Sequence, residues 1–216
     1  FQPLQVFRPS TKGIYSHNTF RKFLVTTQFV ISIALVAGTL LIQDQLQLVR
    51  SQDLGFNKNA ILVVPTNGDT AIVRHLEFIR NELSQVNGVR AITGSSTVPG
   101  QSTTNHYTEI EMTDGKMSPT NINFNFVDHD FLATYSIPLL AGRNFLREVK
   151  ADDTTAYLIN ETAAKDFGWT PEEAIGKQVN HGSSGKIIGV MKDFHYRSLH
   201  TRVEPLMIGL TSYVSR

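Results

Sequence analysis

The chain has 216 residues, of which 41% are hydrophobic and 18% charged, an ordinary composition for a globular protein. Twenty Lys and Arg residues nearly balance 19 Asp and Glu residues, so no excess of basic charge favours a nucleic-acid partner. The lack of Cys excludes disulfides, thiolate metal sites and a Cys nucleophile. Because residue 1 is Phe, we expect the sequence to be a piece of a longer chain.

Residues 23–42 form one uninterrupted run without Asp, Glu, Lys, Arg, His or Pro. A helix of this length is about 30 Å long, which matches the hydrocarbon thickness of a bilayer. The alternatives are a buried helix of a soluble protein, which usually keeps a polar stripe, and a signal peptide, whose apolar run is shorter. The run therefore predicts a transmembrane helix.

Apolar residues continue after this run at Ile42, Leu46 and Val49, and the first helix breaker is Gly55. We predict one helix from about residue 21 to residue 52, with the transmembrane part and a stalk in residues 23–52. Residues 1–22 carry four basic residues and no acidic one, so the positive-inside rule predicts a basic cytoplasmic lead. The part after residue 42 has a net charge of −3, from 16 basic and 19 acidic residues, and is expected outside the cytoplasm.

The external part shows the short strands and helices of an α+β fold. Residues 60–64 are an apolar run that predicts a buried strand, and residues 69–86 predict a helix capped by Asp69 and stopped by Gly88. A short coiled-coil strip is the alternative for that helix. Further strands are predicted at residues 89–95, 107–112 and 121–127. In the last of these, Ile122, Phe124 and Phe126 alternate with three Asn residues, as in an antiparallel strand with one buried face.

The second half begins after a short helix that Asp128 is expected to cap and that ends at Tyr135. A strand at residues 156–159 precedes a helix capped by Asn160 and stopped by Gly168. Residues 170–173 form a capping box with Pro at the first helical position. Strands at residues 178–181 and 186–191 are joined by a hairpin turn at residues 182–185, and residues 205–210 predict a last strand.

Three patterns invite a chemical interpretation. Residues 182–186 resemble a phosphate loop, but the glycines are too close together for one. Ser96 with His106 or His129 would suggest a serine hydrolase, although the nucleophile motif around Ser96 is incomplete. Asp193 and His195 would share one face of an extended segment and could hold a divalent metal, whereas a locally bonded polar loop is the alternative. We predict no catalytic, cofactor-binding or metal-binding residue, and hence no enzyme.

Several motifs occur together in the order found in MacB/FtsX-type ABC transporter permeases, which the chain resembles over nearly its whole length. The resemblance starts with the basic pair, the apolar span and stalk, and Asp53-Leu54-Gly55-Phe56 before residues 61–64. It continues with residues 130–132, 140–145, 158–164 and 175–177, and ends with residues 187–195. The lead-in at residues 1–6 is similar to the start of the second half of an eight-helix permease of the Bacteroidetes type.

The resemblance implies a periplasmic module made of a porter-like α+β subdomain at residues 53–140 and a smaller, inserted Sabre-like subdomain at residues 141–203. Residues 204–216 would return to the porter-like subdomain. It also implies a bacterial inner-membrane permease without cofactors that couples to a separate ATPase subunit by mechanotransmission. A homodimer or pseudo-dimer, membrane lipid, and a periplasmic adaptor or cell-envelope protein are the further expected partners. A single-span sensor with an external ligand-binding domain, or an anchored external hydrolase, would be the alternative.

Overall fold

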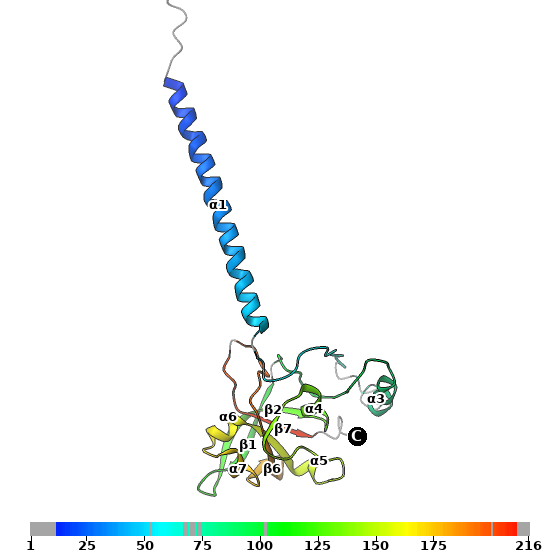
Figure 1. The fold of residues 1–216 in the computed structure, drawn as a ribbon. Coiled ribbons are helices and arrows are strands. Elements are labelled where there is room, and N and C mark those ends of the chain that lie inside the picture. The colour runs from blue at the N-terminus through cyan, green and yellow to red at the C-terminus, as the bar shows by residue number, and fades with distance from the viewer. Residues whose placement is uncertain are drawn as a thin grey trace, which may run out of the picture. The chain divides into compact units, whose positions relative to one another are not determined.

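The computed structural model describes residues 12–51, 53–66, 69, 72, 75–101, 103–199 and 201–210. The chain forms two compact units, Phe1–Asp53 and Leu54–Arg216. The first unit contains helix α1, Lys12–Ser51, which is continuous over 40 residues (Figure 1). The predicted helix is confirmed, and it starts earlier than residue 21 because no Pro interrupts residues 12–20.

Helix α1 is about 60 Å long, which is twice the thickness of the hydrocarbon core of a bilayer. Its segment Thr19–Leu48 is long and apolar enough to cross a membrane by length and composition. Large apolar side chains on every side of this segment are exposed, among them Phe29 and Leu35. A helix that is apolar all round is suited to lipid contact.

The second unit is built on one seven-stranded sheet, in the order β3-β6-β4-β7-β2-β1-β5, and β5 also pairs with β6. Six strands therefore close into a ring, and β3 is attached to β6 outside it. Strand pairs β2–β7 and β4–β6 are parallel, and the other pairs are antiparallel. The strands are β1 Thr104–Glu111, β2 Met117–Val127, β3 Leu139–Gly142, β4 Ala156–Asn160, β5 Gln178–His181, β6 Ser183–Met191 and β7 Leu206–Leu210.

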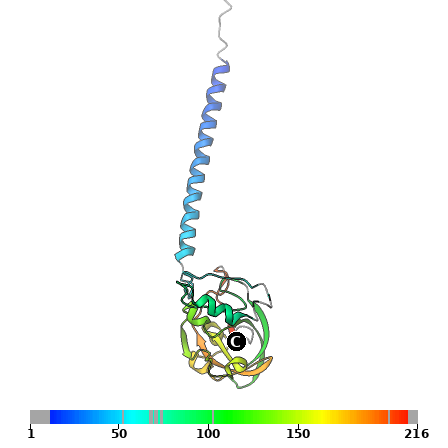
Figure 2. The same cartoon turned by 90° about the vertical axis from the view of Figure 1, so that its right-hand side faces the viewer.

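Five described helices accompany the sheet (Figures 1 and 2). They are α3 Leu76–Ser84, α4 Phe131–Tyr135, α5 Asp152–Thr155, α6 Glu161–Asp166 and α7 Pro171–Ala174. The two predicted caps are confirmed. The Asn160 side chain accepts a hydrogen bond from the Ala163 amide at the start of α6, and Thr170 and Glu173 form a capping box at the start of α7.

Two cores lie on opposite faces of the sheet. In β4, Tyr157 and Ile159 join one core while Leu158 between them joins the other. The first of these cores also contains Ile110, Val179 and further strand residues, and it fills the ring. The other core lies on the outer face, where α4 and segments near Phe56 and Phe194 cover the sheet. A strand whose alternate residues enter two cores must be buried on both faces, as β4 is throughout.

Two predicted strands are wrong. Residues 60–64 form no strand, since Ala60 has a positive φ of 59° and the side chain of Leu62 is 87% exposed. Residues 89–95 are not a strand either, and only Ser95 makes an isolated bridge, to Val127. An apolar run forms a strand only when another strand accepts its backbone hydrogen bonds, and the described chain offers residues 60–64 no such neighbour.

The one-sided burial expected for residues 121–127 is also wrong. β2 is covered on both faces, so Asn123 and Asn125 are buried between the apolar residues. Their amides are bonded: Asn125 accepts from the Ser96 hydroxyl and the Thr97 amide and donates to the Thr97 carbonyl. Buried amides with such partners cost little, which explains why a polar alternation can occur in a buried strand.

The cap predicted for Asp69 is not tested, because residues 70, 71, 73 and 74 lie outside the described residues. Helix α3 begins at Leu76, and none of its residues is buried. Helix α4 has Asp130 at its N-cap position, not Asp128. The Asp128 carboxylate nevertheless accepts a hydrogen bond from the Asp130 amide, so it does bond the start of this helix. It also accepts hydrogen bonds from Arg80 of α3 and from the Thr93 hydroxyl, and therefore connects α3 to the sheet as well.

Strand β3 and helix α5 were not predicted. β3 contains Leu140 and Gly142 of the Pro-containing stretch in which we expected a break. The expected subdomain boundary near residue 141 thus lies within β3, and strands from both sides of it share one sheet. The predicted hairpin between β5 and β6 is present, but it turns at Gly182 alone, because Ser183 already pairs with His181.

Candidate functional site

Residues 54–57, here called the docking segment, immediately follow the first unit and lie against the outer core of the second. The Leu54 carbonyl accepts a hydrogen bond of 2.8 Å from the His195 amide. The Asn57 amide donates one of 2.8 Å to the Tyr135 carbonyl. Because backbone bonds hold the segment at both ends, its path over the core is defined.

Gly55 permits the close approach of this segment to the sheet unit. Its φ is +75°, a conformation that residues with a Cβ rarely adopt. A Cβ atom at this position would lie 2.6 Å from the Asp193 carbonyl oxygen and 2.9 Å from the Phe194 Cα. Both neighbours are backbone atoms, so no side-chain rotation could relieve the overlap.

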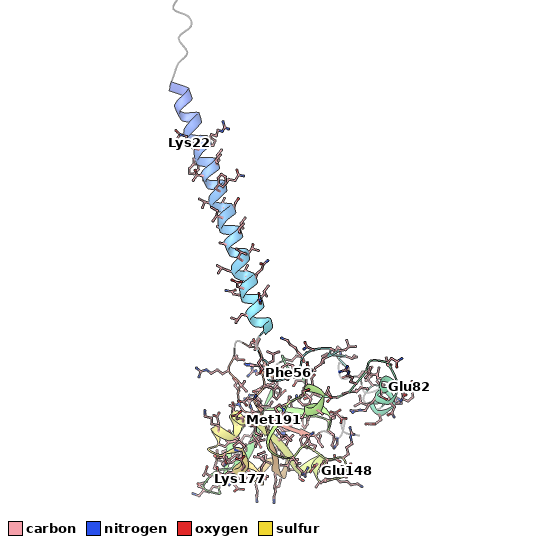
Figure 3. All side chains as sticks on the ribbon, viewed as in Figure 1. Lys22, Phe56, Glu82, Glu148, Lys177 and Met191 are labelled. Atoms are coloured by element: carbon pink, nitrogen blue, oxygen red, sulfur yellow. The ribbon has the colours of Figure 1, made fainter. Side chains whose placement is uncertain are left out.

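Phe56 supplies the apolar contact of the docking segment. Its ring meets Tyr135 and Phe194 edge to face, with centroid distances of 5.8 and 6.2 Å. Edge-to-face pairs at these distances are favourable beyond the area they bury. Phe56 packs on the outer core, to which Met191 of β6 belongs (Figure 3).

Beneath the docking segment, Asp193 is held by three hydrogen bonds. Its carboxylate accepts from the Asn160 side-chain amide at 2.9 Å, the Thr162 amide at 3.0 Å and the Thr162 hydroxyl at 2.6 Å. Asn160 is fully buried and also accepts from the Leu206 amide and donates to the Glu204 carbonyl. The segment that contacts Gly55 is therefore bonded to β4, α6 and the start of β7.

Tyr196 and Arg197 complete this support. The Tyr196 hydroxyl donates to the Glu204 carbonyl at 3.3 Å, and the Arg197 guanidinium pairs with the Glu204 carboxylate at 2.6 Å. Burial, and to a lesser extent the Glu204 charge, raise the pKa of the Tyr196 hydroxyl, so it remains a protonated donor at any physiological pH. This polar network is suited to hold a segment in place, since each of its groups is occupied by another protein group.

The structure does not bring the suggested hydrolase residues together. The Ser96 hydroxyl donates to Asn125 at 2.7 Å and accepts from the Phe126 amide at 3.1 Å. His106 stacks on Phe124. His129 is buried, and neither of its ring nitrogens has a hydrogen-bond partner within the described structure. Burial lowers the pKa of His129, and the Arg147 charge lowers it further.

Asp193 and His195 serve the docking segment. The three donors that bond the Asp193 carboxylate would compete with a metal ion for its oxygens. His195 bonds the docking segment through its backbone amide. Among the described residues there is no group of three His, Cys, Asp or Glu side chains placed to hold a metal. The suggested phosphate loop is the turn at Gly182 followed by β6, with no helix N-terminus behind it.

The docking segment itself was missed as a site. Gly55 was interpreted as a helix C-cap, and nothing near Phe56 in the sequence indicates Tyr135 or Phe194 as its partners. The feature of the sequence that could have indicated this site is the pair Gly55-Phe56 after the polar end of the helix. A glycine followed by an aromatic residue allows a close backbone approach and a ring contact together.

The model of the MacB-like periplasmic core domain family matches residues 23–211. Solved structures that resemble part of this chain include the periplasmic region of MacB from Actinobacillus actinomycetemcomitans, at 16% identity and a TM-score of 0.45, over 62% of this chain and 54% of that one. The extracellular domain of the noncanonic ABC-type transporter YknZ from Gram-positive bacteria matches at 18% identity and a TM-score of 0.42, over 62% and 61%.

This chain thus spans little more than half the length of these structures. No curated protein sequence gives a significant match. The family match covers both the apolar helix and nearly all of the sheet unit, and it confirms the family indicated by the ordered motifs. The chain belongs to the MacB-like periplasmic core domain family.

Proposed function

We propose that the chain is part of the permease subunit of an ABC transporter and that it carries movement from the membrane to the external domain. The observations behind this proposal are a continuous 40-residue helix that ends at Ser51 and a docking segment that begins at Leu54 and is bonded at both ends. A helix without a break transmits a displacement, whereas a flexible linker would absorb it. The docking segment then passes this displacement to the sheet unit.

The absence of a reactive group at this site agrees with a mechanical role. Asp193, Asn160 and Tyr196 are bonded to other protein groups and face no cavity of a substrate's size among the described residues. ATP hydrolysis would then occur on a separate ATPase subunit. Family membership supports this division of labour, in which the permease itself is not an enzyme.

The proposed membrane topology follows the charge distribution. The basic residues before the apolar segment are placed in the cytoplasm, and the sheet unit in the periplasm of a bacterial inner membrane. A permease homodimer or a pseudo-dimer of two halves would place two sheet units side by side. A periplasmic adaptor or cell-envelope protein, and membrane lipid around Thr19–Leu48, are the further proposed partners. The division into porter-like and Sabre-like subdomains is part of the same proposal.

The mechanical role is tested by inserting two Gly residues after Gln47 in the full-length permease. A Gly is roughly 1 kcal/mol less favourable than Ala in a helix, so the insertion creates a hinge. The matched control is an insertion of two Ala residues, which changes length and helical phase equally but keeps the helix stiff. We expect the Gly insertion to abolish ATP-dependent changes in deuterium uptake of the sheet unit while the ATPase subunit still binds ATP. An equal response of both variants would refute the transmitting role of α1.

The partner is tested by purifying the full-length protein from its native membrane. A permease should copurify with a subunit that carries a Walker A motif. A sensor would instead copurify with a kinase or cyclase, and that result would refute the proposed function.

A further inference from the structure

The ring closes at a short seam between β1 and β5. β5 pairs with β6 through four residues but with β1 only through Glu109↔Asn180 and Ile110↔Val179. The outer face of this seam is polar: Asn180 donates to the Glu109 carboxylate at 3.2 Å, and Lys177 pairs with Glu111 at 3.0 Å. On the inner face, Ile110 and Val179 are fully buried.

Two histidines lie on that inner face. His181 follows Val179 by two residues on β5, and His106 precedes Thr108 by two residues on β1. The Thr108 hydroxyl donates to the Asn180 carbonyl at 2.9 Å, next to His181. Side chains two residues apart on a strand share a face, so both imidazoles are on the side of the fully buried Ile110 and Val179. Their ring centroids are 5.1 Å apart.

Aromatic rings enclose the pair. Phe124 of β2 stacks on His181 with a centroid distance of 4.4 Å and on His106 with 5.3 Å. Tyr157 of β4 meets His181 edge to face at 6.2 Å, and its hydroxyl donates to the His181 carbonyl at 3.3 Å. Neutral imidazoles suit such an apolar environment, whereas a charged imidazolium loses its hydration there.

No opposite charge faces the pair within the described strands. Glu109 of β1 and Lys186 of β6 belong to the outer face, where they lie opposite Asn180 and Gln178. On the inner face β6 contributes Gly185, opposite Val179, and the uncharged Ser183, opposite His181. β1 contributes Thr108 and the backbone of Tyr107, which bonds the His181 ring. Nδ1 of His181 is buried without a partner. Burial, and then the neighbouring His106, lower the pKa of His181.

We propose that His106 and His181 make the β1–β5 seam sensitive to acid, so that the ring is closed at neutral pH and opens at this seam on mild acidification. Protonation of both rings places two like charges next to each other and against Phe124, with no carboxylate to compensate them. Separation of the short strand β5 from β1 exposes His181 to water and removes this repulsion. Opening would be local, since the pairs of β2 with β7 and of β4 with β6 do not involve either histidine.

Hydrogen–deuterium exchange of the full chain in detergent tests this at about pH 7.5 and about pH 5.5, with rates divided by the intrinsic rates at each pH. We expect peptides from β5 and the adjoining part of β1 to exchange roughly tenfold faster at the lower pH, while those from β7 stay unchanged. His181→Phe and His106→Phe keep an aromatic ring but cannot be protonated, and should remove the acceleration. His75→Phe, at an exposed position, is the matched control and should retain it.

The proposal is overturned if the exchange rate at the seam of the unsubstituted chain does not depend on pH. It is also overturned if both ring variants show the same acceleration, or if exchange accelerates equally in all strands. Titration of the unsubstituted chain by NMR needs no variant and provides a second test. It should show that the pKa of the His181 imidazole is lowered by burial and by the neighbouring His106. A pKa of His181 at or above its ordinary value would also overturn the proposal.

Discussion

The docking segment makes its sharpest prediction at Gly55. Replacement by Ala adds one Cβ atom, which would lie 2.6 Å from the Asp193 carbonyl oxygen and 2.9 Å from the Phe194 Cα. The Ala residue must also adopt a φ of +75°, or else the neighbouring residues must move. The substitution therefore combines two costs, a strained backbone and an overlap with backbone atoms.

The size of each cost follows from general values. A residue with a Cβ in the left-handed region costs roughly 1–2 kcal/mol, and forcing an extra carbon into a filled space adds about 1–3 kcal/mol. Together the two costs give about 2–5 kcal/mol, which corresponds to a loss of roughly 5–15 °C in Tm for a domain of this size. The docking segment could instead detach from the sheet unit. The loss of stability would then equal the free energy that the contacts of this segment contribute, and the His195 amide would lose its acceptor.

Gly115→Ala is the matched control, because Gly115 has a similar φ of +78° but no atom within 4 Å of the added Cβ. It bears the backbone cost without the overlap. Thermal unfolding of both variants, together with deuterium exchange of peptides containing His195 and Asn57, separates the two costs. We expect Gly55→Ala to be clearly the less stable variant and to lose protection at both amides. Equal melting temperatures with unchanged protection would refute the close approach on which the proposed coupling rests.

Three other substitutions or conditions test the fold around the site. Asn160→Ala leaves the buried amides of Ala163 and Leu206 without their acceptor, and urea unfolding should show a loss of about 3–5 kcal/mol. A loss under about 1 kcal/mol would contradict the linking role of Asn160. Arg80→Ala removes the ion pair with the buried Asp128 and should lower the free energy of unfolding by about 2–3 kcal/mol. Deuterium exchange should become faster in α3 than elsewhere, and Arg80→Lys should retain part of the ion pair. Unchanged exchange of α3 in Arg80→Ala would contradict the role of this ion pair in holding α3. Burial lowers the pKa of both His129 and His181 in the folded chain. Below about pH 6.5 the unfolded chain therefore binds more protons than the folded one. The free energy of unfolding consequently decreases as the pH falls through and below that value. Tm measured between about pH 7.5 and 5 should fall, and it should fall less when both histidines are replaced by Phe; an identical slope would contradict their contribution.

Local signals in the sequence were reliable where a short stretch contains all the groups it needs. The capping box at residues 170–173 and the cap of Asn160 were predicted correctly because the side chain and the amide it bonds are three residues apart. Helix α1 was predicted for a similar reason, since backbone hydrogen bonds within a helix need no partner from elsewhere.

Predictions failed where the partner lies far away in the chain. The apolar residues 60–64 have the composition of a strand, but composition does not specify a neighbour, and Leu62 is exposed. Asp128 was assigned only to a local cap, and the sequence did not indicate that its carboxylate also bonds Arg80, 48 residues earlier. Asn123 and Asn125 were expected in water because the sequence does not reveal that a second layer covers β2.

By itself, then, the sequence determined the long apolar helix, the charge asymmetry across it, the local caps and, through the order of its motifs, the family. Only the tertiary structure decided that six strands close into a ring, that Gly55 and Phe56 lie against Asp193 and Phe194, and that His106 meets His181. The physical reason is the range of the interactions. Helix hydrogen bonds, caps and lipid contact depend on neighbours along the chain, whereas strand pairing, aromatic contacts and buried hydrogen-bond networks depend on which distant segments the fold brings together.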